Sequence, residues 1–365
     1  MSQLPFVLKV GEVRNFGEGR NFIWVRCVQG PDGTIYFRGK MKSTDGGRSV
    51  VAHDDDRWER ILRPNNPDGI GEENLFIAHL CRPGLFIALG QDTEYESRGV
   101  YRGPLWRSTD DLKTIEESTA VFRVPDGPRR RRKKYEWYGI YAWRNIVEMP
   151  DGALLATIEG NFHSDRVVPV GHRNRDEFPG DEPYKLRTAI VRSTDNGESW
   201  DYVSTVARPT EDDDAVGEGY GEPSFVQLDN GDLFCIMRSG NYTPLYSARS
   251  TDSGNSWEGP VYTGLERGLD PCLIKLADGR LLSCYGVRYP AGSPGGPGEE
   301  GMGSAQIRLA ISEDGSGRAW EETIIGEGIG SSYPTIYEVE PNLIFCQVDG
   351  YYWRVMLRPR IPDTL

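Results

Sequence analysis

The sequence lacks any apolar stretch that approaches about 18 residues, and no basic N-terminal segment precedes an apolar one. It therefore offers no candidate membrane-spanning helix and no visible export signal. As printed, it predicts a soluble cytoplasmic protein, or a secreted one if a signal segment was removed before it. Positive charge is also scarce, because 42 Lys and Arg face 55 Asp and Glu for a net charge of −13 at pH 7. This balance argues against a surface for nucleic acid or for anionic membranes.

The six cysteines form no Cys-x-x-Cys pair, and no ligand cluster has metal spacing. Each cysteine stands in an apolar strand pattern, which is typical of a buried free thiol. We therefore predict no disulfide, no metal and no other cofactor. The chain does have 44 Gly and 24 Pro, a composition that suits frequent turns and does not suit long helices.

A short turn pattern occurs five times. STDNGESW at 193–200 and STDSGNSW at 250–257 are the fullest copies, and looser ones begin at Ser43, Ser108 and Ser312. The pattern supplies neither the roughly twelve-residue ligand loop nor the closing Glu of a calcium-binding EF-hand. Ser and Asp side chains instead bond nearby backbone N–H groups, and Gly adopts the positive φ of a tight turn. The repeat is therefore predicted to be structural.

A second repeat is an apolar run broken by a two-residue turn, as in FVQLDNGDLFCIM at 225–237. Asp-Gly or Asn-Gly between alternating apolar runs is a strong hairpin signal. The chain has six such hairpins, and a strand pair closed by the Ser–Asp turn follows the first five. This order predicts an all-β fold, a six-bladed β-propeller that forms a single domain over 1–365. The last blade lacks one strand, which the N-terminal segment at 5–14 is predicted to supply.

In a propeller, the residues just before each innermost strand meet at one mouth. Alignment of the six hairpins on their turns selects Trp24, Leu75, Trp143, Glu222, Asp270 and Tyr333. Two carboxylates and a tyrosine at equivalent positions of a concave mouth are a candidate active site. The alternative is a structural role, in which these groups bond the backbone of neighbouring blades.

The turns and hairpins together resemble those of the sialidase superfamily over nearly the whole chain. More specifically, YGEPSFVQLDNGDLFCIMRSG at 220–240 resembles the sialidase segment in which a Glu before Pro-Ser precedes a substrate-binding Arg. The resemblance implies that Glu222 is the base for a tyrosine nucleophile, Tyr333, and that Arg238 binds a substrate carboxylate. A tyrosine hydroxyl has an ordinary pKa near 10, so it needs an adjacent carboxylate to take its proton.

The chain departs from that family in its first blade. GRNFIWVRCVQG at 19–30 replaces the usual Arg-Ile-Pro motif, and the loop that usually carries the acid/base Asp is absent. Candidates for these roles come from other positions. The further catalytic candidates are Asp270 and Asp92, and the further substrate-binding candidates are Arg26, Arg144, Arg288, Trp24, Trp143 and His163. His163 beside Asp165 is also a candidate for the missing acid or base.

Three segments are predicted to be loops. The insertions at 159–187 and 289–306 follow second strands, and long loops at a propeller mouth often shape a binding cleft. The basic run RRRRKK at 129–134 lies between a turn and an aromatic strand, which favours a solvated loop.

The sequence thus predicts a sialidase-like exo-glycoside hydrolase that acts on a terminal acidic sugar through Glu222 and Tyr333. Arginine side chains suit an acidic sugar because two N–H donors match the two oxygens of a carboxylate. Two alternatives stay open. One is a polysaccharide lyase on the same propeller, and the other is a non-catalytic propeller in which Trp24, Trp143 and Tyr333 stack on sugar rings. The expected partner is a carbohydrate in every case, and the oligomeric state is not predicted.

Overall fold

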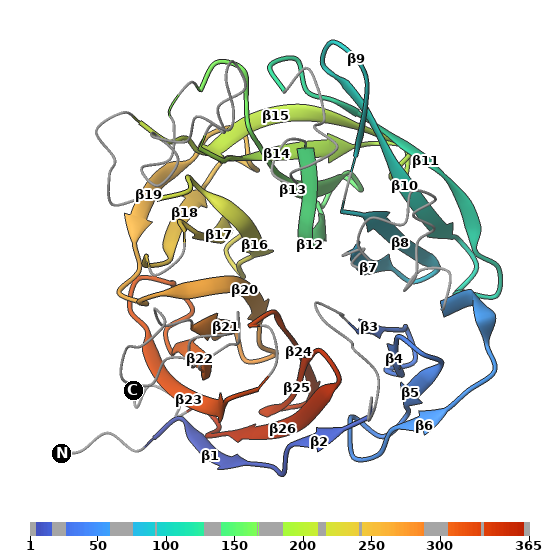
Figure 1. The fold of residues 1–365 in the computed structure, drawn as a ribbon, viewed down its shortest axis with the longest axis vertical. Coiled ribbons are helices and arrows are strands. Elements are labelled where there is room, and N and C mark those ends of the chain that lie inside the picture. The colour runs from blue at the N-terminus through green and yellow to red at the C-terminus, as the bar shows by residue number, and fades with distance from the viewer. Residues whose placement is uncertain are drawn as a thin grey trace, which may run out of the picture.

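The computed structural model describes residues 5–16, 27–58, 76–91, 93–127, 140–165, 167, 185–210, 217–240, 243–287, 306–329 and 332–360. The chain is all-β, and its strands surround a central axis with β3, β7, β12, β16, β20 and β24 innermost (Figure 1). Within the described residues, no helix has the length and apolar character to cross a membrane.

The described strands form five sheets, whose members are mostly consecutive along the chain. Three sheets have four strands each in chain order. They contain β3 (Val28–Gln29), β4 (Ile35–Phe37), β5 (Met41–Ser43) and β6 (Val51–Ala52); β16 (Gly221–Gln227), β17 (Leu233–Arg238), β18 (Tyr246–Ser250) and β19 (Glu258–Tyr262); and β20 (Gly268–Lys275), β21 (Leu281–Val287), β22 (Gln306–Ser312) and β23 (Glu321–Glu327).

The largest sheet has nine strands and consists of two antiparallel groups. Its members are β7 (Phe76–Arg82), β8 (Leu85–Gly90), β9 (Glu94–Ser97), β10 (Val100–Ser108) and β11 (Glu116–Arg123), then β12 (Ile140–Glu148), β13 (Leu154–Gly160), β14 (Arg187–Ser193) and β15 (Ser199–Ala207). The groups join only where Val121–Arg123 of β11 pairs in parallel with Ser199–Asp201 of β15. These two groups are therefore hydrogen-bonded to each other at their outer strands.

The fifth sheet brings together the two ends of the chain. It combines β24 (Pro334–Glu340), β25 (Leu343–Val348) and β26 (Tyr351–Leu357) with the N-terminal strands β1 (Val7–Val10) and β2 (Arg14–Asn15). Strand β1 pairs antiparallel with β26, and Arg358 N donates a 2.7 Å hydrogen bond to Phe6 O. The prediction that the N-terminal segment completes the last sheet is therefore confirmed, and the ring closes between β1 and β26 (Figure 1).

All five Ser–Asp repeats form the predicted turns. In the copy at 193–200, Ser193 Oγ accepts from Gly197 N at 2.9 Å and donates to Asp195 Oδ1 at 2.8 Å, while that oxygen accepts from Ser199 N at 2.9 Å. The closing Trp200 is fully buried and donates from Nε1 to Gly197 O at 2.9 Å. The corresponding serine–aspartate bonds occur at Ser43, Ser108, Ser250 and Ser312.

The same hydrogen bonds make the turns sensitive to acid. The donors of Ser256, followed by that of Ser250, lower the pKa of Asp252 to about 2. A lowered folded-state pKa means that the turn is stabilised most above the unfolded pKa near 4. That contribution is lost as the pH falls toward 2.

The cores lie between neighbouring strand groups, and the thiols lie among them. Aliphatic side chains of β21, β22, β25 and β26 form one cluster, to which Phe6 also belongs. All six cysteines are free, and all but the partly buried Cys81 are buried. This agrees with the expected state of the thiols.

Replacement of Ser193 by Ala is expected to lower the free energy of unfolding by about 1–3 kcal/mol, because the buried Gly197 N–H loses its acceptor. Urea denaturation of the wild type and the variant measures this difference. Ser97→Ala, at an exposed position of β9, is the control and should lie within about 0.5 kcal/mol of the wild type. Equal stability of both variants would show that the turn bonds contribute nothing.

Replacement of Phe6 by Ala is expected to cost about 3–5 kcal/mol, because this side chain is 3% exposed against the last sheet. The neighbouring Leu8 is 55% exposed, so Leu8→Ala should change stability by less than about 0.5 kcal/mol. Thermal and urea unfolding of the pair compare the two positions. A small loss in the Phe6 variant would contradict ring closure through the N-terminal strand.

Candidate functional site

Three innermost strands change backbone conformation where they reach the axis. Arg144, Glu222 and Asp270 have φ angles of 55°, 46° and 42°, and the ladders of β12, β16 and β20 shift register there. A bulged residue donates no ladder bond, which is why Pro223 and Pro271 are tolerated in inner strands. Such conformations cost about 1–3 kcal/mol each in non-glycine residues and cluster at functional sites. The bulges aim these three side chains at one another.

The Glu222 carboxylate is the centre of the site. Its Oε1 accepts from Tyr333 Oη at 3.0 Å and from Arg238 Nη1 at 2.7 Å. Its Oε2 accepts from Asp270 N at 2.7 Å. Glu222 and Tyr333 are 6% and 9% exposed. The structure thus brings together Glu222, Tyr333 and Arg238, which the sequence placed at one mouth.

Arg238 is held between two carboxylates. Besides Glu222, it donates from Nη2 to Glu218 Oε2 at 2.8 Å, and its side chain is 4% exposed. Burial works to lower the pKa of Arg238, but the charges of Glu222 and Glu218 outweigh burial and raise it. Arg238 therefore places a positive charge directly against the Glu222 side chain.

Arg144 and Asp270 form a second, fully internal pair. Arg144 donates through Nη2 to Asp270 Oδ2 and, at 3.2 Å, through Nε to Asp270 Oδ1. Both side chains are at most 3% exposed. The sequence assigned catalysis to Asp270 and substrate binding to Arg144. The structure shows that the two groups are partners of each other across the axis, and both assignments stay predictions.

Trp143 differs from its predicted role. Alignment on the hairpin turn selected Trp143, but the residue with positive φ is Arg144. Trp143 and Ile146 pair with the adjacent residues Thr157 and Ala156, so β12 has two extra residues between them. Trp143 is 4% exposed, and its indole lies beside the Glu159 carboxyl. A side chain this deeply buried has no face on which a sugar ring can stack.

Glu159 is a site residue that the sequence analysis missed. It stands five residues after Leu154 on β13, as Arg238 stands five after Leu233 on β17. Its Oε2 accepts from Glu222 N, and it makes no ion pair among the described residues. Burial, and then the charge of Glu222, raise the pKa of Glu159 to about 8. Alignment of the second strands, in addition to the first, would have found it.

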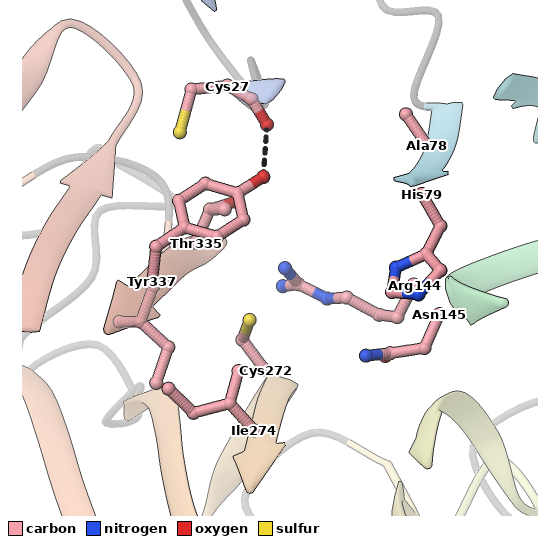
Figure 2. Close-up of a pocket in the computed structure, with 10 residues that line it drawn as sticks. Cys27, Ala78, His79, Arg144, Asn145, Cys272, Ile274, Thr335 and Tyr337 are labelled. Atoms are coloured by element: carbon pink, nitrogen blue, oxygen red, sulfur yellow. Dashed lines mark hydrogen bonds between the residues drawn. The ribbon is translucent and has the colours of Figure 1, made fainter. Parts of the chain in front are cut away.

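A small cavity is lined by Arg144 and by residues of the inner strands β7, β12, β20 and β24. Its volume is about 80 Å³, and Figure 2 shows Arg144 reaching between His79 and Tyr337, whose Oη donates to Cys27 O at 2.9 Å. One benzene ring needs a cavity of about 150 Å³, so this space accommodates water molecules and not a sugar. The candidate site is therefore the Glu222 cluster, not this cavity.

The remaining predicted residues fall into two groups. The first lies outside the described residues and comprises Trp24, Leu75, Arg26, Asp92 and Arg288. The second is His163 with Asp165, which do not form the proposed acid/base pair. His163 is exposed after β13, whereas Asp165 is buried between Arg187, at 2.5 Å, and Arg208, at 2.5 Å.

Several solved structures share this fold. A protein of unknown function from Dyadobacter fermentans DSM 18053 has a TM-score of 0.64 and 17% identity, with 97% of this chain and 100% of that one covered. The Hadza microbial sialidase Hz136 has a TM-score of 0.57 and 13% identity over 92% of this chain, which spans 65% of the sialidase. A leech intramolecular trans-sialidase has a TM-score of 0.54 and 12% identity, with 96% and 70% covered.

Comparison of the amino-acid sequence with protein-family models assigns the chain to a family. No curated protein matches the chain. The family model for BNR repeat-like domains matches residues 85–345, a segment that begins in β8 and includes the Glu222 cluster. The chain therefore belongs to the BNR repeat-like domain family.

Proposed function

We propose that this protein is a glycoside hydrolase in which Glu222 and Tyr333 form the nucleophilic pair. The observation that carries the proposal is the 3.0 Å hydrogen bond from Tyr333 Oη to Glu222 Oε1 at the axis of the ring. The sialidases among the similar structures support carbohydrate as the substrate class. The protein acts on a carbohydrate, and neither nucleic acid nor membrane is part of the proposal.

The proposed scaffold is a six-bladed β-propeller that forms one domain. Six groups of consecutive strands support it, because the nine-stranded sheet divides into β7–β11 and β12–β15 at a short parallel pairing. The β1–β26 pairing joins the ends of the ring. In such a scaffold the inner strands of all six groups deliver side chains to one mouth.

The reaction follows from the positions of two groups. As Tyr333 Oη attacks the anomeric carbon, its proton passes to Glu222, which is already the hydrogen-bond acceptor. A neutral tyrosine beside a carboxylate brings less negative charge to the sugar than a second carboxylate would. Arg238 holds the Glu222 oxygen in place. Water then attacks the same carbon, and the overall reaction retains the anomeric configuration.

Selectivity for an acidic sugar depends on residues beyond the Glu222 cluster. Arg144 and Arg238 are each paired with carboxylates, so the proposal of an acidic sugar relies on Arg26 and Arg288. A substrate carboxylate would otherwise have to displace Glu218 from Arg238. The substrate panel must therefore include acidic and neutral sugars.

Tyr333→Phe and Glu222→Gln are each expected to lower kcat/KM by more than about 100-fold, because one removes the nucleophile and the other its base. Release of a fluorescent aglycone from sialic acid, glucuronic acid, rhamnose and neutral hexosides measures this. Tyr262→Phe, at an exposed position of β19, is the matched control and should retain full activity.

The outcomes separate the alternatives. Loss in Glu222→Gln alone would replace the tyrosine mechanism by one with two carboxylates. An unsaturated product that absorbs in the ultraviolet would identify a lyase. Glycan binding without turnover in all variants would contradict the hydrolase and leave a binding propeller.

Asp270→Asn is expected to cost about 3–5 kcal/mol of stability, because it leaves the buried Arg144 guanidinium without its counter-charge. Urea denaturation measures the loss. The double variant Arg144→Met with Asp270→Asn should recover part of it, since no buried charge then lacks a partner. A stable single variant with impaired catalysis would instead support the catalytic assignment of Asp270.

A further inference from the structure

We propose that Glu159 is the proton donor to the leaving group, in a role that rests on the proposed hydrolase function. The sequence offered no acid in register, because the first-blade loop that usually carries it is absent. The structure places a carboxyl group in the Glu222 cluster from another element, the end of β13.

The position of Glu159 is set by its contact with Glu222. Glu159 Oε2 accepts the backbone N–H of Glu222, whose own side chain bonds Tyr333. Gly221 permits this approach, since a Cβ there would lie 2.9 Å from Glu159 Oε2. The three groups of the proposed reaction are thus linked in a row: Glu159, Glu222 and Tyr333.

The charges around Glu159 distinguish it from the other carboxylates of the site. Glu222 and Glu218 share Arg238, and Asp270 pairs with Arg144. Glu159 has no such partner among the described residues, although it is 5% exposed. A buried carboxyl group without a neighbouring cation keeps its proton to a higher pH. Where two carboxyl groups of one site differ in this way, the group with the raised pKa acts as the acid and the other acts as the base.

The groups that face Glu159 come from four elements. Glu222 at the start of β16 raises its pKa, and Arg238 on β17 and the Trp143 indole on β12 oppose this rise. Tyr141 on β12 and Thr188 on β14 occupy the paired registers. With a pKa of about 8, Glu159 is protonated at neutral pH.

The proton balance of the reaction is complete with this assignment. In the first step the glycosidic C–O bond breaks, the leaving oxygen takes the Glu159 proton, and Tyr333 Oη bonds the anomeric carbon as Glu222 takes the phenolic proton. In the second step water attacks that carbon and gives a proton to the Glu159 carboxylate. Tyr333 Oη leaves and recovers its proton from Glu222, so that every group returns to its starting state.

Leaving groups of different basicity test this role in the wild type. With a methyl glycoside of the sugar that the panel identifies, kcat/KM should fall as the pH rises through about 8, because Glu159 loses its proton. With the 2,4-dinitrophenyl glycoside, whose leaving group needs no proton, this basic limb should be absent. The comparison requires no variant and therefore does not depend on whether a variant folds.

Glu159→Gln provides the second test. Activity on the methyl glycoside should fall by more than about 100-fold, and activity on the 2,4-dinitrophenyl glycoside by less than about tenfold. Glu148→Gln is the matched control, at the opposite end of the same β12–β13 hairpin, where Glu148 pairs with Arg82. It should behave as the wild type with both substrates.

The pH dependence of stability tests the protonation of Glu159 independently of catalysis. A raised folded-state pKa makes Glu159 stabilising at low pH, a contribution that is lost as the pH rises from about 4.3 to about 8. Glu159→Gln should remove this slope whether or not Glu159 is catalytic. Equal losses with both glycosides, or a basic limb with both, would overturn the proton-donor role alone. No turnover by the wild type on the whole panel would overturn the proposed function and this role together.

Discussion

The carboxylate of Glu222 is the interaction on which the centre of the ring depends. It accepts hydrogen bonds from Tyr333, from Arg238 and from the backbone of Asp270, so three elements meet on two oxygens. A buried carboxylate that loses its donors is costly, and this cost holds the three elements in one arrangement. The left-handed φ at Glu222 is maintained in the same way, because its own N–H is bound by Glu159.

Charge compensation divides the axial side chains into two kinds. Arg144 with Asp270, and Arg238 with Glu222 and Glu218, are satisfied within the protein and form a rigid base for the mouth. Tyr333 and Glu159 stand at the ends of this network, and each is neutral at pH 7 in the proposed mechanism. Glu222 connects the two kinds, because it is paired with Arg238 and also takes the Tyr333 proton in the proposed mechanism.

The fold could be predicted from the sequence because its determinants are local. The hydrogen bonds of the Ser–Asp turn lie within eight residues, as at 193–200. Each two-residue hairpin turn also fixes which residues of its two strands pair. Closure by the N-terminal strand followed from a missing partner in the last group. The meeting of Glu222 and Tyr333 was predictable for the same reason, since repeated units place equivalent residues at equivalent distances from the axis.

The Arg144–Asp270 pair could not be predicted, because it depends on bulges and on a contact across the axis. In β12 two residues lie between the paired Trp143 and Ile146 while their partners are adjacent, so counting from the turn chose the wrong side chain. Asp270 was predicted from its repeat position alone, and its ion pair with Arg144 on another strand was not foreseen. Glu159 was hidden because only first strands were aligned, although a second strand also ends at the mouth. In a repeated fold, residues at equivalent backbone positions can differ in chemistry. Glu159 on β13 stands at the position that Arg238 has on β17, and it carries a carboxyl group in place of a guanidinium group.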